Sequence, residues 1–207
     1  MSVEEHKRQA PALADVRVAV LTVSDTRTEA SDVGGQLVRQ LCQQAGATVA
    51  SAHILRDEPR EVAARVRSLV ADGQVNVLLL TGGTGISRRD TTVEALAGLF
   101  DKTLEGFGEL FRMLSFQEIG SAAMLSRATA GVVGGVLVFV MPGSPKAVAL
   151  AMSRLILPEL GHMVAQLGPP AGAAASPAAA SPADNPSPGD RHTPRGHSHH
   201  GHDHGPR

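Results

Sequence analysis

Short apolar runs alternate along most of this chain with longer segments of helical spacing, and this alternation limits the fold more than any other feature. The first run, residues 16–23 (VRVAVLTV), is apolar nearly throughout, as in a strand buried on both faces. Similar runs occupy residues 48–55, 75–80 and 136–140. Each is followed by a loop and then by a helix-like segment. Strands and helices in this order predict an α/β fold with a mainly parallel sheet and right-handed crossovers.

The helix-like segments begin and end at recognisable residues. Apolar residues recur every fourth position from Val33 until Gly46, which acts as a helix stop. Pro59 occupies a typical first position of the second helix. A third helix starts near Thr92, where residues 91–94 (TTVE) have the pattern of a capping box. The last helix runs from Lys146 onward, and Pro158 is expected to kink or split it. Between residues 101 and 130 the pattern is less regular, with a helix over 109–119 and a shorter one before Gly131.

Composition changes abruptly at Gly168, which sets the expected domain boundary. The forty residues 168–207 contain eight of the thirteen prolines and six of the nine histidines, and they contain no Leu, Ile, Val, Phe or Met. Such a segment has nothing to bury, so we expect it to stay disordered. The sequence therefore predicts one folded domain over residues 15–167, a flexible arm over 1–14 and a disordered Ala/Pro/Gly- and His-rich tail over 168–207.

Charge and composition argue against several classes of function. Nineteen Lys and Arg are balanced by twenty Asp and Glu, so there is no basic excess to neutralise a phosphate backbone. Trp and Tyr are absent, and with them the aromatic belts of membrane proteins. We find no signal-peptide core and no run near the ~20 apolar residues of a spanning helix. These features predict a soluble, cytosolic protein that binds neither nucleic acid nor membrane.

Ligands of open α/β sheets bind beside the carboxyl ends of the strands, so the loops there are the candidate site. The most informative loop, residues 81–90, begins TGGTG, and its glycines would let backbone amides approach a phosphate ahead of a helix N-terminus. It lacks the lysine of a P-loop, and Arg88 stands where the dinucleotide fingerprint has glycine. A purely structural turn is the alternative. The candidate binding residues are Ser24, Asp25, Thr81, Gly82, Gly83, Thr84, Gly85, Glu109, Pro142, Gly143 and Ser144.

Two aspartates, Asp57 and Asp90, project from the same predicted sheet edge and are the candidate catalytic residues. Each could simply cap a neighbouring helix. Carboxylates that converge on a phosphate site would repel the ligand unless they hold Mg²⁺, so the constellation favours a metal–nucleotide complex. Glu109 fits the same edge but could equally be a solvated helix residue. Cys42, on the apolar stripe of its helix, is expected to be a buried structural thiol.

The motifs together resemble a known family. The segment TGGTG with the following RRD and EAL (81–96), the block LEGFGELFRMLSFQEIGSAAMLSRATAG (104–131), the turn MPGSPKA (141–147) and the opening VLTVSDTR (20–27) look like the MoaB/MogA family of molybdenum-cofactor biosynthesis proteins. The block GFGELFRMLSFQEIG is most like the MoaB branch. The resemblance spans essentially all of residues 15–167.

The resemblance implies a three-layer α/β/α domain that assembles into homotrimers or homohexamers. The implied activity is that of a molybdopterin adenylyltransferase, which transfers AMP from Mg-ATP to the molybdopterin phosphate and releases pyrophosphate. Molybdopterin and ATP would be the substrates, with Mg²⁺ as cofactor and other cofactor-biosynthesis proteins as further partners. The family's acidic site residues fall at Asp57 and Asp90, its glycine loop at Gly82, Gly83 and Gly85, and its nucleotide-side turn at Pro142, Gly143 and Ser144.

Two other functions fit the sequence. One is a catalytically silent pterin-binding or scaffold protein of the same pathway, which turnover assays of Asp57 and Asp90 variants would distinguish. The other is a metal-handling protein built around the tail, since neutral imidazoles bind Ni²⁺, Zn²⁺ or Cu²⁺. The candidate ligands there are His192, His197, His199, His200, His202 and His204. Their spacing lacks the fixed pattern of a structural zinc site.

Overall fold

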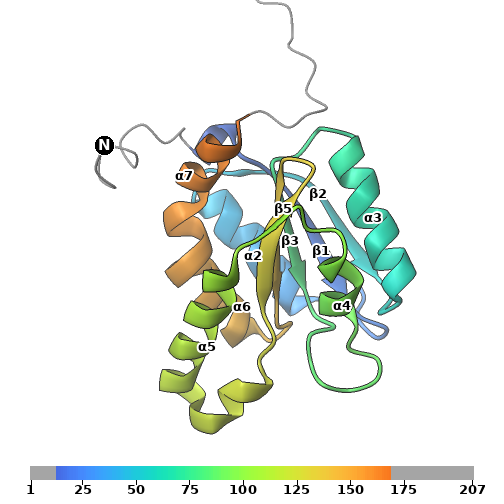
Figure 1. Cartoon of the computed structure of the whole chain (residues 1–207), viewed down its shortest axis with the longest axis vertical. Coiled ribbons are helices and arrows are strands. Elements are labelled where there is room, and N and C mark those ends of the chain that lie inside the picture. The colour runs from blue at the N-terminus through green and yellow to red at the C-terminus, as the bar shows by residue number, and fades with distance from the viewer. Residues whose placement is uncertain (1–12, 169–207) are drawn as a thin grey trace, which may run out of the picture. The chain divides into compact units, whose positions relative to one another are not determined.

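A six-stranded sheet forms the centre of the protein in a computed structural model that describes residues 13–168 (Figure 1). The strands lie in the order β2-β1-β3-β6-β5-β4. The four parallel strands are β1 (Arg17–Val23), β2 (Thr48–Leu55), β3 (Val77–Thr81) and β6 (Val136–Met141). Antiparallel pairing adds β5 (Thr129–Val133) beside β6 and the short β4 (Lys102–Thr103) beside β5. The prediction of a mainly parallel α/β sheet is confirmed.

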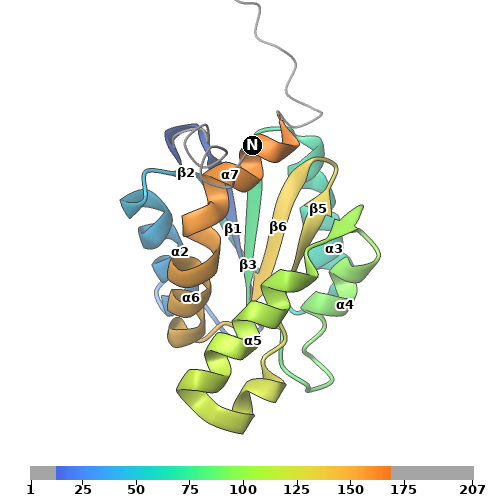
Figure 2. The ribbon, with the colours of Figure 1, turned by 60° about the vertical axis from the view of Figure 1, so that its left-hand side comes forward.

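Helices cover both faces of the sheet, which confirms the three-layer architecture (Figures 1 and 2). One face packs against α2 (Val33–Gln44), α5 (Glu105–Ile119), α6 (Pro145–Ala151) and α7 (Leu157–Leu167). The other packs against α3 (Pro59–Ala71) and α4 (Thr92–Ala97). Short helical turns complete the described chain: η1 (Leu13–Asp15), η2 (Gly120–Leu125) and η3 (Met152–Ile156). Most of the predicted arm and tail, residues 1–12 and 169–207, lies outside the described residues.

The central strands have apolar side chains on both faces because each face meets a helical layer. In β1, Val18 and Val20 belong to the core under α2 and α6, whereas Ala19 and Leu21 belong to the core under α3. All four are at most 1% exposed. This is the physical reason for the continuous apolar run in the sequence, since a half-exposed strand would alternate polar and apolar residues.

The connections place the carboxyl ends of β1 and β3 at the point where the chain reverses direction across the sheet. From β1 the chain passes through α2 to β2 on one side, and then through α3 on the opposite face to β3 on the other side of β1. Such a switch point leaves a crevice outside the strand ends, which is where doubly wound proteins bind their ligands.

A β-hairpin lies in the region that appeared irregular in the sequence. Strands β5 and β6 pair antiparallel through Gly134 and Gly135, whose φ angles are +56° and +84°. A two-residue turn with positive φ at both positions matches the twist of a hairpin and favours glycine. The predicted short helix before Gly131 corresponds to η2, whereas the strand over residues 129–133 was not predicted.

The last helix is interrupted before Pro158, as the sequence predicted. A π-helical segment, η3, separates α6 from α7. Proline has no N–H to bond the carbonyl four residues earlier, and a widened turn accommodates that missing bond.

The whole run Pro145–Leu167 is long and apolar enough to cross a membrane by length and composition alone. The prediction that no segment reaches this length is thus wrong. Its apolar residues Val148, Met152, Ile156 and Leu160 are nevertheless fully buried in the core, as in the packed helix of a globular domain.

Candidate functional site

A cavity of about 350 Å³ opens at the carboxyl ends of β1, β3 and β6. Its position is the switch point of the sheet. Three segments surround it, namely the end of β1 with its loop, the start of α2, and the paired loops after β3 and β6. The lining residues are Thr22, Val23, Ser24, Arg27, Asp32, Gly34, Thr81, Gly82, Gly143, Ser144 and Pro145.

The N-terminus of α2 forms one wall of this cavity. Asp32 caps the helix, since its Oδ1 accepts a hydrogen bond from the Gly35 N–H at 2.9 Å. Its Oδ2 accepts a 2.7 Å hydrogen bond from the Thr22 hydroxyl at the end of β1. The residue is only 3% exposed, so this buried carboxylate joins strand to helix. A Cβ on Gly34 would lie 2.8 Å from the Gly143 carbonyl oxygen, so glycine lets the two backbones approach closely.

The turn after β6 forms the opposite wall. Ser144 caps α6, with its Oγ accepting a 3.3 Å hydrogen bond from the Ala147 N–H. The Thr81 hydroxyl, at the end of β3, donates to the Pro142 carbonyl at 3.3 Å and ties the two loops together. Two helix N-termini therefore face one cavity, and their partial positive charges and backbone N–H groups favour an anion. Arg27 adds a full positive charge to the lining.

The glycine loop leaves β3 in a conformation that needs glycine. Gly82 and Gly83 have φ angles of +99° and +60°. A Cβ on Gly82 would overlap the Val23 carbonyl, and one on Gly83 would overlap the Thr92 hydroxyl and lie 2.9 Å from Asp57 Oδ2. The first two glycines of TGGTG thus bring the loop against β1 on one side and against Asp57 on the other.

Asp57, Asp90 and Asp25 form an acidic edge beside the cavity, and Asp57 is the least exposed of the three, at 7%. Its Oδ1 accepts hydrogen bonds from the N–H and the hydroxyl of Thr91, at 3.4 and 3.2 Å. Burial raises the pKa of this carboxyl above its usual range, and the nearby charges of Asp90 and Asp25 act in the same direction. Asp57 does not cap α3, whose N-cap residue is Glu58, so the interpretation as a cap of the following helix is wrong.

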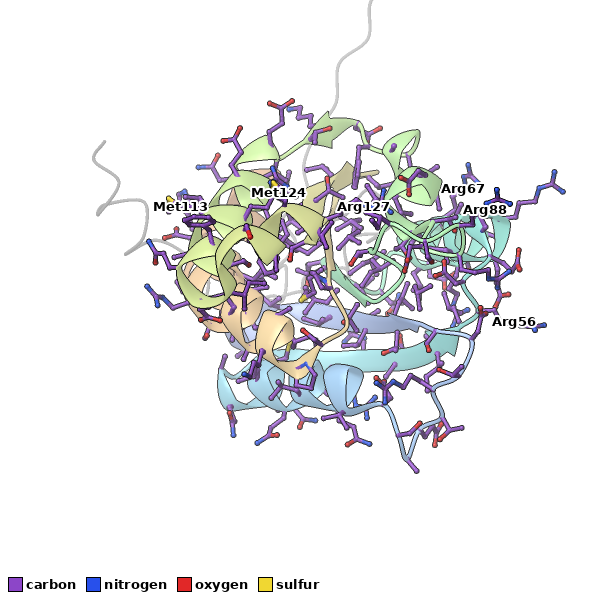
Figure 3. All side chains as sticks on the ribbon, turned by 90° about the horizontal axis from the view of Figure 1, so that it is seen from below. Arg56, Arg67, Arg88, Met113, Met124 and Arg127 are labelled. Carbon is purple, nitrogen blue, oxygen red and sulfur yellow. The ribbon has the colours of Figure 1, made fainter. Side chains whose placement is uncertain are left out.

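Asp90 is held within its own loop. Its Oδ2 accepts a 2.9 Å hydrogen bond from the Ser87 N–H, and hydrogen bonding from Ser87 holds the pKa of Asp90 below its ordinary value. Arg127, from the segment between η2 and β5, closes the same loop by donating to the carbonyls of Thr84 at 3.0 Å and Asp90 at 2.9 Å. Figure 3 shows Arg127 between η2, where Met124 is labelled, and the loop after β3, where Arg88 is labelled.

The predicted capping box at the start of α4 does not form, because both of its side chains have partners elsewhere. The Thr91 hydroxyl donates to Asp57, and the Glu94 carboxylate forms an ion pair with Arg127. A tertiary contact has replaced the local one in each case.

The exposed acid Asp25 connects the loops after β1, β2 and β3. Its Oδ1 accepts the Asp57 N–H at 3.2 Å, and its Oδ2 accepts two hydrogen bonds from Arg89 at 3.1 and 2.6 Å. The Arg89 guanidinium holds the pKa of Asp25 below its usual range and also pairs with Glu58 at 3.0 Å. These bonds link the loops after β1, β2 and β3 to one another.

Comparison with known proteins places this geometry in a family. Residues 19–162 match the family model described as a probable molybdopterin binding domain. The chain belongs to that family. The molybdenum cofactor biosynthesis protein B of Bacillus cereus is 51% identical over 168 residues, covering 81% of this chain and 98% of the relative. The Bacillus subtilis protein of the same name has the same identity and coverage.

Solved structures agree with the sequence relatives. A crystal structure of a molybdenum cofactor biosynthesis protein B has a TM-score of 0.72 at 51% identity and covers 73% of this chain and 95% of its own. The tungsten cofactor synthesizing protein MoaB from Pyrococcus furiosus has a TM-score of 0.66 at 37% identity, with coverage of 73% and 96%. The resemblance to the MoaB/MogA family is therefore confirmed.

Within this molybdopterin-binding domain, most of the predicted binding residues come together. Ser24, Thr81, Gly82, Gly143 and Ser144 line the cavity itself. The other candidate residues belong to the adjoining loops. Pro142 accepts the hydrogen bond from Thr81, and Thr84 and Gly85 belong to the glycine loop. Asp25, Asp57, Gly83 and Asp90 lie at the acidic edge.

Glu109 does not join them. It lies on an exposed face of α5 and is not among the residues that line the cavity at the switch point, so the structure does not bring it together with the other candidate residues.

Several residues of the site were not predicted from the sequence. Asp32 had a usable signal, because an aspartate directly before a helix-spaced segment is a typical N-cap. Arg127 had none, since its partners lie 37 and 43 residues away along the chain. Thr92 was recognised only as a helix start, although its buried hydroxyl faces Asp57 across Gly83.

Residues 13–168 contain no group of three or more His, Cys, Asp or Glu side chains that could hold a metal ion. The tail histidines lie outside the described residues. Cys42 is fully buried in the core, as predicted. His53 lies away from the acidic edge and contacts Arg65 in a larger hollow of about 870 Å³ along β2. That hollow contains none of the predicted site residues.

An apolar face covers the outer side of α5 and η2. Figure 3 shows Met113 and Met124 at the same end of the molecule, and both are at least half exposed. We refer to the set as the α5/η2 face, and its exposed members are Leu110, Met113, Phe116, Ile119, Met124 and Leu125. Exposed apolar side chains gathered in this way mark an interaction surface.

Proposed function

We propose that this protein acts in molybdenum cofactor biosynthesis as a molybdopterin adenylyltransferase. The observation that carries the proposal is the juxtaposition of an anion-favouring cavity with an acidic edge at the switch point of the sheet. The names of the relatives at 51% identity, which are molybdenum cofactor biosynthesis proteins, support the pathway. The specific reaction rests on the chemistry of the residues.

The cavity suits phosphate groups. The N-termini of α2 and α6, the glycine loop after β3 and Arg27 all present donors or positive charge to one space. Transfer of a nucleotidyl group between phosphates needs positioning and charge neutralisation more than it needs a strong base. The site accordingly contains no histidine or cysteine nucleophile among the cavity-lining residues.

In the proposed reaction, an oxygen of the molybdopterin phosphate attacks the α-phosphorus of ATP. A new phosphoanhydride bond forms between them, the bond between the α-phosphorus and the bridging oxygen breaks, and pyrophosphate leaves with that electron pair. The backbone amides of the loops after β3 and β6 would orient the two phosphates, and Asp90 would be positioned by its bond to Ser87.

The acidic edge fits a divalent cation of the kind that ATP carries. Asp57 Oδ2 has no hydrogen bond to the described part of the chain, while Oδ1 is fixed by Thr91. One carboxylate together with substrate phosphates and waters is a usual Mg²⁺ environment. Mg²⁺ held there would neutralise charge on the triphosphate.

We further propose that the protein is a soluble, cytosolic homo-oligomer, a trimer or a hexamer. Exposure of the apolar α5/η2 face to water is unfavourable. Because most soluble oligomers are symmetric assemblies of identical chains, we propose that another copy of this chain covers the face.

The decisive experiment incubates the purified protein with molybdopterin, Mg²⁺ and ATP and detects adenylylated pterin by chromatography and mass spectrometry. Asp90→Asn keeps the shape and the bond from Ser87 but removes the charge, so we expect a loss on the order of 10²–10³ in turnover. Asp72→Asn, an exposed carboxylate after α3, is the matched control and should leave turnover unchanged.

Two results would contradict the proposal. Wild-type protein that binds molybdopterin but forms no adenylylated product would instead indicate the silent pterin-binding protein. Near wild-type turnover by Asp90→Asn would remove the reason for placing the chemistry at this loop.

A further inference from the structure

The Thr92 hydroxyl is an exception to the hydrogen bonding of this domain. Within residues 13–168 it is the only buried side-chain nitrogen or oxygen atom without a hydrogen-bond partner. The residue is 0% exposed, and its backbone N–H is fixed to the Gly83 carbonyl at 3.0 Å. A buried polar group without a partner destabilises the folded state, so its presence needs a reason.

The surroundings of the hydroxyl indicate that reason. Thr92 Oγ1 and Asp57 Oδ2 both border the space that a Cβ on Gly83 would occupy. Each of these oxygens lacks a hydrogen-bond partner in the described part of the chain. Gly83 itself is only partly buried, and its missing side chain leaves the Thr92 and Asp57 oxygens as its nearest neighbours on this side.

The chemistry of the pair selects a cation over an anion. A carboxylate oxygen is only an acceptor, so Asp57 would repel a phosphate brought against it. Two neighbouring oxygens, one charged and one neutral, suit a hard divalent cation, which binds oxygen ligands. We infer that the Thr92 hydroxyl and Asp57 Oδ2 together hold a divalent cation of the Mg²⁺ class.

This inference deepens the proposed function, because the cation would be the one delivered with ATP, and it adds Thr92 to the site. It also separates the roles of the aspartates. Asp57 Oδ2 lies beside the Thr92 hydroxyl at Gly83, whereas Asp90 is bonded to Ser87 within its own loop. Thr92 and Asp57 are therefore the cation ligands of this edge, and Asp90 contributes through the position and charge of the loop.

The test uses Thr92→Val, which has nearly the same shape without the hydroxyl, in the full-length protein. If the hydroxyl is kept for a cation, its removal should have opposite effects on two measurements. In metal-free buffer, the melting temperature should rise by roughly 2–8 °C, because the unsatisfied polar atom is gone. When MgCl₂ is added, the increase in melting temperature seen for the wild type should require about tenfold or more Mg²⁺.

Thr92→Ser, which keeps the hydroxyl, should retain the wild-type response to Mg²⁺. Thr48→Val, at the amino end of β2 and so at the opposite end of the sheet, is the matched control and should respond like the wild type. Melting is followed by calorimetry with Mg²⁺ alone, so the result does not depend on adenylyl transfer. Failure of the adenylylation assay would therefore leave this test intact.

Two outcomes would overturn the inference. An unchanged Mg²⁺ response in Thr92→Val would mean that the hydroxyl meets only an internal water. A wild-type melting temperature that does not respond to Mg²⁺ at all would mean that the two oxygens hold no cation.

Discussion

Gly83 provides a quantitative test of the geometry at the acidic edge, through the variant Gly83→Ala. Two separate penalties apply there. The φ angle of +60° costs an L-residue about 1–2 kcal/mol. A Cβ would also overlap Thr92 and lie 2.9 Å from Asp57, and overpacking of this kind costs about 1–3 kcal/mol. We therefore expect Gly83→Ala to reduce the free energy of unfolding by about 2–5 kcal/mol.

Other glycines of the chain separate the two penalties. Gly46 has a φ angle of +91° and nothing within 4 Å of the place that a Cβ would take, so Gly46→Ala reports the backbone penalty alone. Gly98 has a φ angle of −83° and equally open surroundings, so Gly98→Ala should be neutral or stabilising by about 0.4–1 kcal/mol. The expected order of stability is Gly98→Ala, then Gly46→Ala, then Gly83→Ala.

The assay is urea unfolding followed by far-ultraviolet circular dichroism, because the chain has no Trp or Tyr to report fluorescence. All variants are compared at one protein concentration, since self-association would add to apparent stability. A Gly83→Ala variant no less stable than Gly46→Ala, within about 0.5 kcal/mol, would refute the close packing of Thr92 and Asp57 around this glycine.

Three further predictions concern other parts of the molecule. Burial raises the pKa of Asp57 in the folded protein above 3.8, so ionisation of this group costs stability as the pH rises from 3.8 through the raised value. Asp57→Asn should therefore be more stable than the wild type at pH 7, and the difference should vanish below pH 3.8. Thermal melts recorded across this pH range test the prediction. A higher melting temperature of the variant that persists below pH 3.8 would contradict it. Phe116, at 61% exposed, lies on the α5/η2 face. If the proposed oligomer forms through this face, Phe116→Glu should dissociate it in sedimentation without lowering helix content, whereas an unchanged sedimentation coefficient would contradict that interface. Cys42 is fully buried, and burial raises the pKa of its thiol to about 12. A thiol reagent should therefore react with Cys42 only after urea unfolds the protein. Rapid labelling of the native protein would contradict this and show that the core opens.

The parts of the fold that were predictable are those set by local pattern. Buried strands such as β1 appear as continuous apolar runs because helices cover both of their faces. The interruption before Pro158 was also predictable, because proline lacks the N–H that its own helix needs, and this does not depend on what the helix packs against. The β5–β6 hairpin carried a signal, Gly134-Gly135 between apolar runs, but the glycines of the preceding block obscured it.

The parts that were not predictable depend on contacts between distant residues. Thr91 and Glu94 have the residue types of a capping box, yet Asp57 and Arg127 take their side chains instead. Glu109 was assigned to the site from its sequence block, although the helical face it occupies points to solvent. Sequence pattern identified the loops of the site, and packing decided which side chains within them meet.

The π-helical segment η3 explains a regularity in the last helix. The buried residues Val148, Met152, Ile156 and Leu160 recur every fourth position. In a regular α-helix of 3.6 residues per turn, such a stripe drifts by about 40° at each step, or roughly 120° from the first residue to the last. A wider turn in the middle takes up an extra residue and returns the stripe toward the sheet. Removing one residue from η3 would restore regular hydrogen bonding without this drift, because Leu160 would then lie eleven positions after Val148, only about 20° from it, and would stay in the core. The irregular turn therefore keeps the rotational phase of the C-terminal helix despite the extra residue.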